Sequence, residues 1–101
     1  MVNKAGLAQL AEHATEAAQL LKSLANESRL MVLCSLIDGE LSVGKLNQVV
    51  PLSQSALSQH LAALRKAQLV HTRRDSQTIY YRLQGHNAEK VIATLKAIYC
   101  P

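Results

Sequence analysis

The stretch that decides the fold is "LSQSALSQHLAALRK", which runs from Leu52 to Lys66. Ser53 suits the N-cap of a helix that reaches about Ala67, because its hydroxyl can accept a backbone N–H of the first turn. Three leucines recur at helical spacing and share one face of that helix: Leu57, Leu61 and Leu64. An opposite arc of about 140° is polar and holds Gln54, Ser55, Ser58, Gln59, Arg65 and Lys66. The pattern predicts a helix that buries one face and presents hydrogen-bonding groups on the other.

The polar arc suits DNA better than bulk water. An ordinary solvated helix face mixes Glu with Lys, whereas this helix contains no acid. Gln can pair bidentately with adenine, and Ser can bond several base edges. Arg65 and Lys66 at the far end suit phosphates, which supply position and much of the affinity. We therefore expect this face, together with Ser53, to contact DNA.

The segment before this helix completes a familiar unit. "LSVGKLNQVV", residues 41–50, reads as a short helix capped by Ser42, with three apolar residues facing inward: Leu46, Val49 and Val50. Pro51 ends it, because proline disfavours helical geometry at the residue before it. Residues 42–67 thus form helix, short turn and helix, which is the helix-turn-helix motif.

The segment after the helix predicts a β-hairpin over residues 69–83. Two β-rich runs, Leu69–Arg73 and Thr78–Leu83, flank a polar turn at Arg74–Gln77. The hairpin is basic, with Arg73, Arg74 and Arg82 in or beside it against one acid, Asp75. A basic hairpin beside a recognition helix is the wing of a winged helix-turn-helix, so we expect Arg73 and Arg74 to lie near phosphate or the minor groove.

Helices are also predicted at both ends of the chain. Near the start, apolar residues are spaced 3, 4, 3, 4, 3 in the manner of a helix seam: Leu7, Leu10, Ala14, Ala17, Leu21 and Leu24. This spacing fits packing against a second copy or against the domain's own core. Asn26 caps the next helix, which carries Cys34 and ends at Asp38-Gly39. The last helix starts near Asn87 and has one apolar face: Val91, Ile92, Leu95, Ile98 and Tyr99.

Composition bounds the class of protein. A chain of 101 residues with 49% hydrophobic residues fits one compact domain, residues 1–101, that is mostly α with a small β-hairpin. The net charge of +4 suggests an anionic partner. No apolar run is long enough for a membrane span and no signal peptide is recognisable, so we expect a cytoplasmic protein without membrane contact. Two cysteines in that compartment are expected to be free, redox-active or metal-bound.

The residues quoted above resemble the ArsR family of winged-helix repressors. The resemblance lies in "LANESRLMVL", "ELSVGKL", "LSQSALSQHLAALRKAQLV" and "RRDSQTIYYRL", in that order. It implies a homodimer, with the helices at about 5–24 and 87–100 forming the interface, that reads a symmetric double-stranded operator. Two positions depart from the family pattern. Lys45 replaces a frequent Glu, and Gln68 replaces a usual Gly, so Gln68 is expected to take a positive φ or to alter the helix end.

The resemblance also raises the question of the signal. Metal-sensing members use a Cys-x-Cys-like motif, where this chain has Ser42 and Gly44, or Asp and His on the last helix, which has neither. We therefore expect no metal site and no cofactor, although a non-standard metal site using Cys34 and Cys100 stays open. Those two cysteines resemble the pair of the HlyU, BigR and SqrR branch, which implies a switch driven by reactive sulfur species such as persulfides, or by other oxidants.

Two other classes of protein stay open at this point. A thiol-dependent sulfur-handling enzyme would need Cys-x-x-Cys, or a cysteine beside a base in a cleft, and neither pattern is visible. A pure interaction module would bind a protein partner and show no salt-dependent affinity for DNA. The expected function is a sequence-specific DNA-binding transcriptional regulator, not an enzyme, whose operator affinity is switched by oxidation of the cysteine pair.

Overall fold

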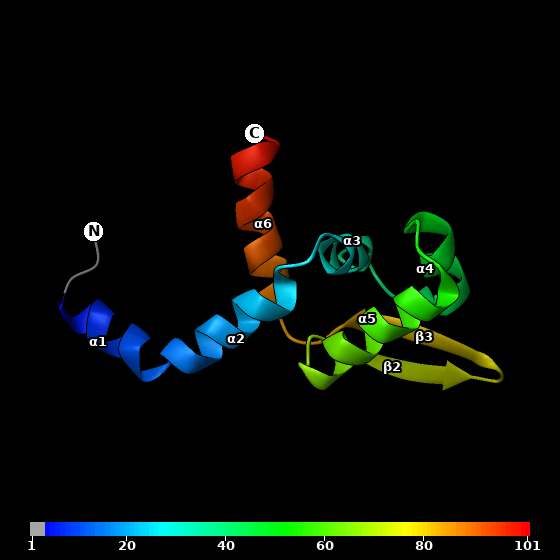
Figure 1. Ribbon diagram of the computed structural model, residues 1–101, viewed down its shortest axis with the longest axis horizontal. Helices are drawn as coiled ribbons and strands as arrows, with labels where there is room; N and C mark the ends of the chain where they lie inside the picture. The colour runs from blue at the N-terminus through cyan, green and yellow to red at the C-terminus, as the bar shows by residue number, and fades with distance from the viewer. Residues whose placement is uncertain (1–3) are drawn as a thin grey trace.

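The computed structural model describes residues 4–101, and side chains from Gly6 onward. Figure 1 shows the order of the elements along the chain. They are α1 (Lys4–Glu12), α2 (Ala14–Leu24), α3 (Glu27–Ser35), β1 (Leu41–Ser42), α4 (Val43–Val49), α5 (Gln54–Lys66), β2 (Val70–Asp75), β3 (Thr78–Leu83) and α6 (Asn87–Tyr99). The predicted class, mostly α with a small β-hairpin in a winged helix-turn-helix, is confirmed.

One hydrophobic core joins the elements from the end of α2 to the middle of α6. Its buried members are Leu24, Val32, Leu33, Leu36, Leu46, Val50, Leu57, Leu61, Leu64, Leu69, Val70, Ala88 and Ile92. The three leucines predicted to form the inner face of α5 all belong to it. The prediction for Val49 is wrong, since 45% of this residue is exposed. Leu46 and Val50 lie one helical turn apart on the inner face, and Val49 between them is rotated outward.

Three predicted helix caps are confirmed by hydrogen bonds. Asn26 Oδ1 accepts the backbone N–H of Arg29 at 3.1 Å, at the start of α3. Ser42 Oγ accepts that of Lys45 at 3.1 Å, at the start of α4. Ser53 Oγ accepts that of Ala56 at 3.1 Å, at the start of α5. Each bond satisfies a donor that the helix leaves unpaired.

The end of α5 confirms the expectation for Gln68. This residue has a φ of 62°, in the left-handed region. The Gln68 N–H donates to the Arg65 carbonyl at 3.0 Å, and the Leu69 N–H donates to the Leu64 carbonyl at 3.0 Å. These two bonds form a Schellman motif, which usually has glycine where Gln68 stands.

The predicted first helix is divided into α1 and α2 at His13. His13 has φ −111° and ψ 13°, outside helical values. Its N–H donates to the carbonyl of Leu10 at 3.0 Å, a tighter i to i−3 bond, and its own carbonyl accepts the N–H of Ala17 as α2 begins. His and the nearby Thr15 are both weaker helix formers than the alanines around them, which favours a break here.

The sheet has three strands in the order β1-β3-β2, one more than the predicted hairpin. β1 pairs antiparallel with β3 through Leu41 and Tyr81. The predicted turn at Arg74–Gln77 is too long, because Arg74 pairs with Ile79 and Asp75 with Thr78. The turn is therefore the two residues Ser76 and Gln77, made possible by a φ of 58° at Ser76.

The described chain is elongated, with principal extents of 51 × 29 × 21 Å. In Figure 1, α1 and α2 form an arm on one side of the body, and α6 projects from it toward the C-terminus. The radius of gyration is 15.3 Å, larger than the roughly 13 Å typical of 100 residues. No helix among residues 4–101 has the length and apolar character needed to cross a bilayer.

Candidate DNA interface and cysteine pair

α5 carries the predicted reading face. Its N-cap and outward side present seven exposed residues: Ser53, Gln54, Ser55, Ser58, Gln59, Arg65 and Lys66. The core holds the helix from behind, because Leu57, Leu61 and Leu64 are each at most 2% exposed. The fold thus brings the predicted α5 residues together on one outward surface.

The turn between α4 and α5 is held by a residue that sequence reasoning missed. The Asn47 Nδ2 donates to the Leu52 carbonyl at 2.8 Å. Val50, buried at 1% exposure, anchors the same turn in the core. Asn47 therefore helps set the position of α5 relative to α4. A single amide at the end of a short helix gave no distinctive signal in the sequence.

A second polar contact ties α5 to α3. The Arg29 Nε donates to His60 Nδ1 at 3.4 Å, and both residues are partly buried. His60 is thus packed against α3 on the rear of α5.

The two adjacent arginines of the wing lie on opposite faces of the sheet. Strand side chains alternate, so Arg74 shares a face with its partner Ile79, and Arg73 shares the other with its partner Tyr80. The Ile79 face borders α5 across a groove of about 580 Å³, whose walls include Ser58, Arg65 and Lys66 of α5. Among the side chains that the structure describes, no acid pairs with Arg74. Arg74 is therefore the wing arginine on the same side of the sheet as α5.

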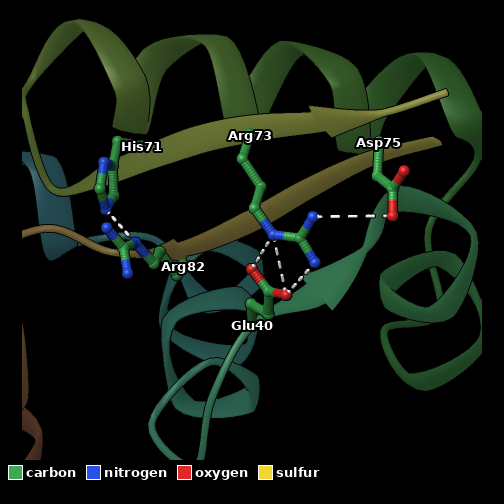
Figure 2. Close-up of polar contacts among 5 residues, drawn as sticks. All are labelled: Glu40, His71, Arg73, Asp75 and Arg82. Carbon is green, nitrogen blue, oxygen red and sulfur yellow. Dashed lines mark hydrogen bonds and ion pairs between the residues drawn. The ribbon is translucent and has the colours of Figure 1, made fainter. Parts of the chain in front are cut away.

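Arg73 has acidic partners on the other face. Figure 2 shows its guanidinium reaching Glu40, with Nε at 2.9 and 3.0 Å from the two carboxylate oxygens. Asp75 lies 3.9 Å away, and the guanidinium stacks over the Tyr80 ring at 4.3 Å. The Glu40 hydrogen bond raises the pKa of Arg73 and lowers the pKa of Glu40. From the sequence, Asp75 was the one acid expected near the wing arginines. Glu40 was missed because it lies 33 residues from Arg73 along the chain.

Beside this cluster, Arg82 donates from Nε to His71 Nε2 across the same strand pair (Figure 2). The third wing arginine is therefore also engaged within the sheet.

The two cysteines lie on different elements that contact each other. Cys34 is on α3, partly buried against the core, and Cys100 is exposed just after α6. α3 packs against α6, whose Ala88 and Ile92 are buried while its last residues are exposed. Both thiols are free. Within the described residues, no group of three or more His, Cys, Asp or Glu side chains is placed to hold a metal ion.

Comparison with known proteins identifies the family. The family model described as "Bacterial regulatory protein, arsR family" matches residues 26–72. The transcriptional activator HlyU of Vibrio cholerae is 48% identical over 94 residues, which cover 93% of this chain and 87% of that protein. The chain belongs to the ArsR family. It is a DNA-binding transcriptional regulator, and its relatives are named as regulators, not enzymes.

Solved structures share this ArsR-family fold. One described as reduced HlyU from V. cholerae has a TM-score of 0.84 and 47% identity, covering 92% of this chain and 98% of that one. The transcriptional repressor BigR of Xylella fastidiosa has a TM-score of 0.88 and 41% identity, covering 92% and 95%. A winged helix-turn-helix domain from Mycobacterium bovis, described as homodimeric and DNA-binding, has a TM-score of 0.75 and 29% identity, covering 89% and 83%.

Proposed function

We propose that this ArsR-family regulator is a homodimer that reads a symmetric operator with α5, and that oxidation of Cys34 and Cys100 lowers its operator affinity. Persulfides and polysulfides are the proposed class of oxidant. The observation that carries the switch is the position of the two free thiols. One lies on α3 in the body of the domain, and the other lies at the end of α6, which packs on α3.

The exposed apolar residues support a dimer built on the terminal helices. Large side chains that a second copy could cover lie on α1, α2 and α6: Leu7, Leu10, Leu21, Ile98 and Tyr99, each at least 53% exposed. Large exposed apolar side chains of this kind are what a subunit interface covers. The homodimeric M. bovis neighbour has the same fold, so we assign residues 5–24 and 87–100 to the interface.

The exposed face of α5 supports the reading role. Gln54, Ser55, Ser58 and Gln59 are proposed to meet base edges in the major groove, while Ser53, Arg65, Lys66 and Arg74 meet phosphates. In a two-fold dimer the two α5 helices would lie about 34 Å apart, one turn of DNA. The wing then follows the backbone beside the groove.

The proposed oxidation can be written step by step. The thiolate of exposed Cys100 takes the outer sulfur of a low-molecular-weight persulfide, R–S–SH, and releases the thiolate R–S⁻. The Cys34 thiolate then attacks Sγ of Cys100, which expels hydrosulfide and leaves a disulfide. If both cysteines carry an extra sulfur, the same attack expels hydrosulfide and leaves a trisulfide. A direct disulfide requires Cα atoms about 4.4–6.8 Å apart, and each added sulfur extends that reach.

Such a link would act on DNA through the dimer. It would fix the end of α6, part of the proposed interface, to the body that holds α5. A change in the spacing of the two α5 helices then weakens simultaneous binding to successive grooves. Allosteric coupling of this kind is typically about 1–3 kcal/mol, or 5–150-fold in affinity.

The test compares wild type with Cys34→Ser and Cys100→Ser, each treated with a persulfide donor and then with a reductant. We expect wild type to lose operator affinity reversibly and both variants to stay bound. Intact-mass measurement separates a disulfide, which loses hydrogen, from a bridge with added sulfur. If either single variant responds like wild type, the paired-cysteine switch is refuted. A parallel series with hydrogen peroxide shows which oxidant class acts.

A further inference from the structure

Arg73 and Arg74 are neighbours in β2 with different electrostatic surroundings. Arg74 lies on the α5 side of the sheet, with no acid paired to it among the described side chains. Arg73 lies on the far side, and Glu40, Asp75 and the Tyr80 ring surround its guanidinium. Two residues that look equivalent in the sequence therefore differ in the charge that they present to DNA.

The Glu40–Arg73 pair spans the whole sheet. Glu40 directly precedes β1, Arg73 is in β2, and β3 lies between those two strands. The Arg73 side chain crosses this middle strand, and its guanidinium stacks on Tyr80 of β3 on the way to Glu40. The pair thus joins the two outer strands in addition to their backbone hydrogen bonds.

Glu40 is also close in sequence to the start of the helix-turn-helix. Ser42, two residues later, is both the last residue of β1 and the N-cap of α4. The β1 segment is only two residues long, so its backbone pairing with β3 offers few contacts to orient the wing. A charged, bidentate contact from Arg73 to the residue before β1 adds a directional restraint at this junction.

We propose that Arg73 and Glu40 form a positioning pair that sets the angle of the wing relative to the helix-turn-helix, and that Arg74 alone supplies the phosphate contact of this part of the wing. In this assignment Arg73 does not touch DNA. It affects DNA binding by holding the wing so that Arg74 reaches its phosphate. A phosphate at Arg73 would have to displace Glu40, whose charge already neutralises the guanidinium. The proposal builds on DNA binding by the family and is independent of the cysteine switch.

The slope of log affinity against log salt separates the two roles. Each lost phosphate contact lowers the slope by about 0.9, or about 1.8 for a dimer. We expect Arg74→Gln to produce this change. Arg73→Gln and Glu40→Gln should each weaken operator binding by about two- to thirtyfold, the range for an exposed ion pair lost twice per dimer, with the slope unchanged. The double variant Arg73→Gln with Glu40→Gln should bind the operator no more weakly than either of these single variants.

The outcome for Glu40→Gln is decisive, because this change leaves Arg73 in place and free. Suppose instead that Arg73 contacts phosphate and that Glu40 competes with this contact. Glu40→Gln would then bind the operator more tightly than wild type, with a steeper salt slope, and the proposal would be overturned. A lowered slope in Arg73→Gln, equal to that in Arg74→Gln, would overturn it as well.

Exchanging the two charges gives a second test, because general destabilisation would not restore operator affinity. The double variant Glu40→Arg with Arg73→Glu keeps the net charge and restores an ion pair across the sheet. A positioning role predicts operator affinity above that of both single variants with the wild-type salt slope. A glutamate placed at a phosphate site would repel DNA, so affinity no better than the single variants refutes the assignment. Thermal unfolding of each variant confirms that the compared proteins are folded.

Discussion

Asn47 and Leu52 are joined across the turn between α4 and α5 by one side-chain hydrogen bond, from Asn47 Nδ2 to the Leu52 carbonyl at 2.8 Å. Pro51 lies inside this turn and has no N–H to contribute. Within the same turn the N–H of Leu52 donates to the Val50 carbonyl at 2.8 Å. The angle at which α5 leaves α4 therefore depends on few polar contacts, and Asn47 supplies one of them.

Replacing Asn47 with alanine should lower the free energy of unfolding by about 1 kcal/mol, because a partly buried hydrogen bond is lost. Urea unfolding followed by circular dichroism measures this. Gln48→Ala is the matched control, since Gln48 is exposed on the same helix, and it should have little effect. Equal destabilisation by the two changes would show that the loss comes from helix propensity and not from the turn.

Gln59→Ala should cost about 1–3 kcal/mol on the cognate operator, the range for a bidentate base contact, and little on random DNA. Arg74→Ala should weaken binding to both DNAs alike, because phosphates carry no sequence information. Fluorescence anisotropy with both duplexes at fixed salt gives the comparison. If Gln59→Ala weakens both duplexes equally, Gln59 does not read a base.

Replacing both Leu10 and Leu21 with aspartate should produce monomers that bind the operator poorly. These leucines are 53% and 60% exposed in the single chain, and charge at a buried interface is costly. Light scattering reports the mass in solution. Val49→Asp, which charges an exposed apolar residue on α4, should leave the dimer intact. A dimer that survives the double change would place the interface elsewhere.

Acidification should remove the contribution of Glu40 to stability. Its hydrogen bond with Arg73 lowers the pKa of the carboxyl in the folded state. A lowered folded-state pKa stabilises the protein above the ordinary glutamate value of about 4.3, and this gain is lost as the pH falls through and below that value. The stability difference between wild type and Glu40→Gln should be constant near neutral pH and should shrink as the pH falls below about 4.3 and on through the lower folded-state pKa. In an Arg73→Gln background the same comparison should lose this pH dependence.

Local rules predicted much of the fold. The helix caps at Asn26, Ser42 and Ser53 depend on side chains next to the helices they start, and all three were confirmed. The buried face of α5 follows from leucine spacing alone. The positive φ of Gln68 followed from a departure from the family pattern at a helix end. In each case the deciding residues lie within a few positions of one another.

The features that sequence reasoning missed depend on weak or distant contacts. The break at His13 interrupts a continuous apolar seam, and helix propensity alone signals it only weakly. The strand β1 has two residues and exists only because β3 lies beside it. The Glu40 partner of Arg73 could not be found from spacing, because the fold alone brings the two together. For the site, the exposed face of α5 was predictable, whereas the unequal surroundings of Arg73 and Arg74 were not.

Glycine usually destabilises a helix, but at Gln68 the left-handed backbone makes glycine the more stable choice. Inside α5 a glycine would loosen the helix, but at Gln68 a side chain costs roughly 1 kcal/mol that glycine would not. The residue is exposed, and both hydrogen bonds of the motif use backbone atoms only. A glycine there would keep those bonds and relieve the strain, whereas a β-branched residue would worsen it. A change from Gln68 to glycine would therefore raise the temperature at which the protein unfolds, without altering the proposed DNA-reading surface.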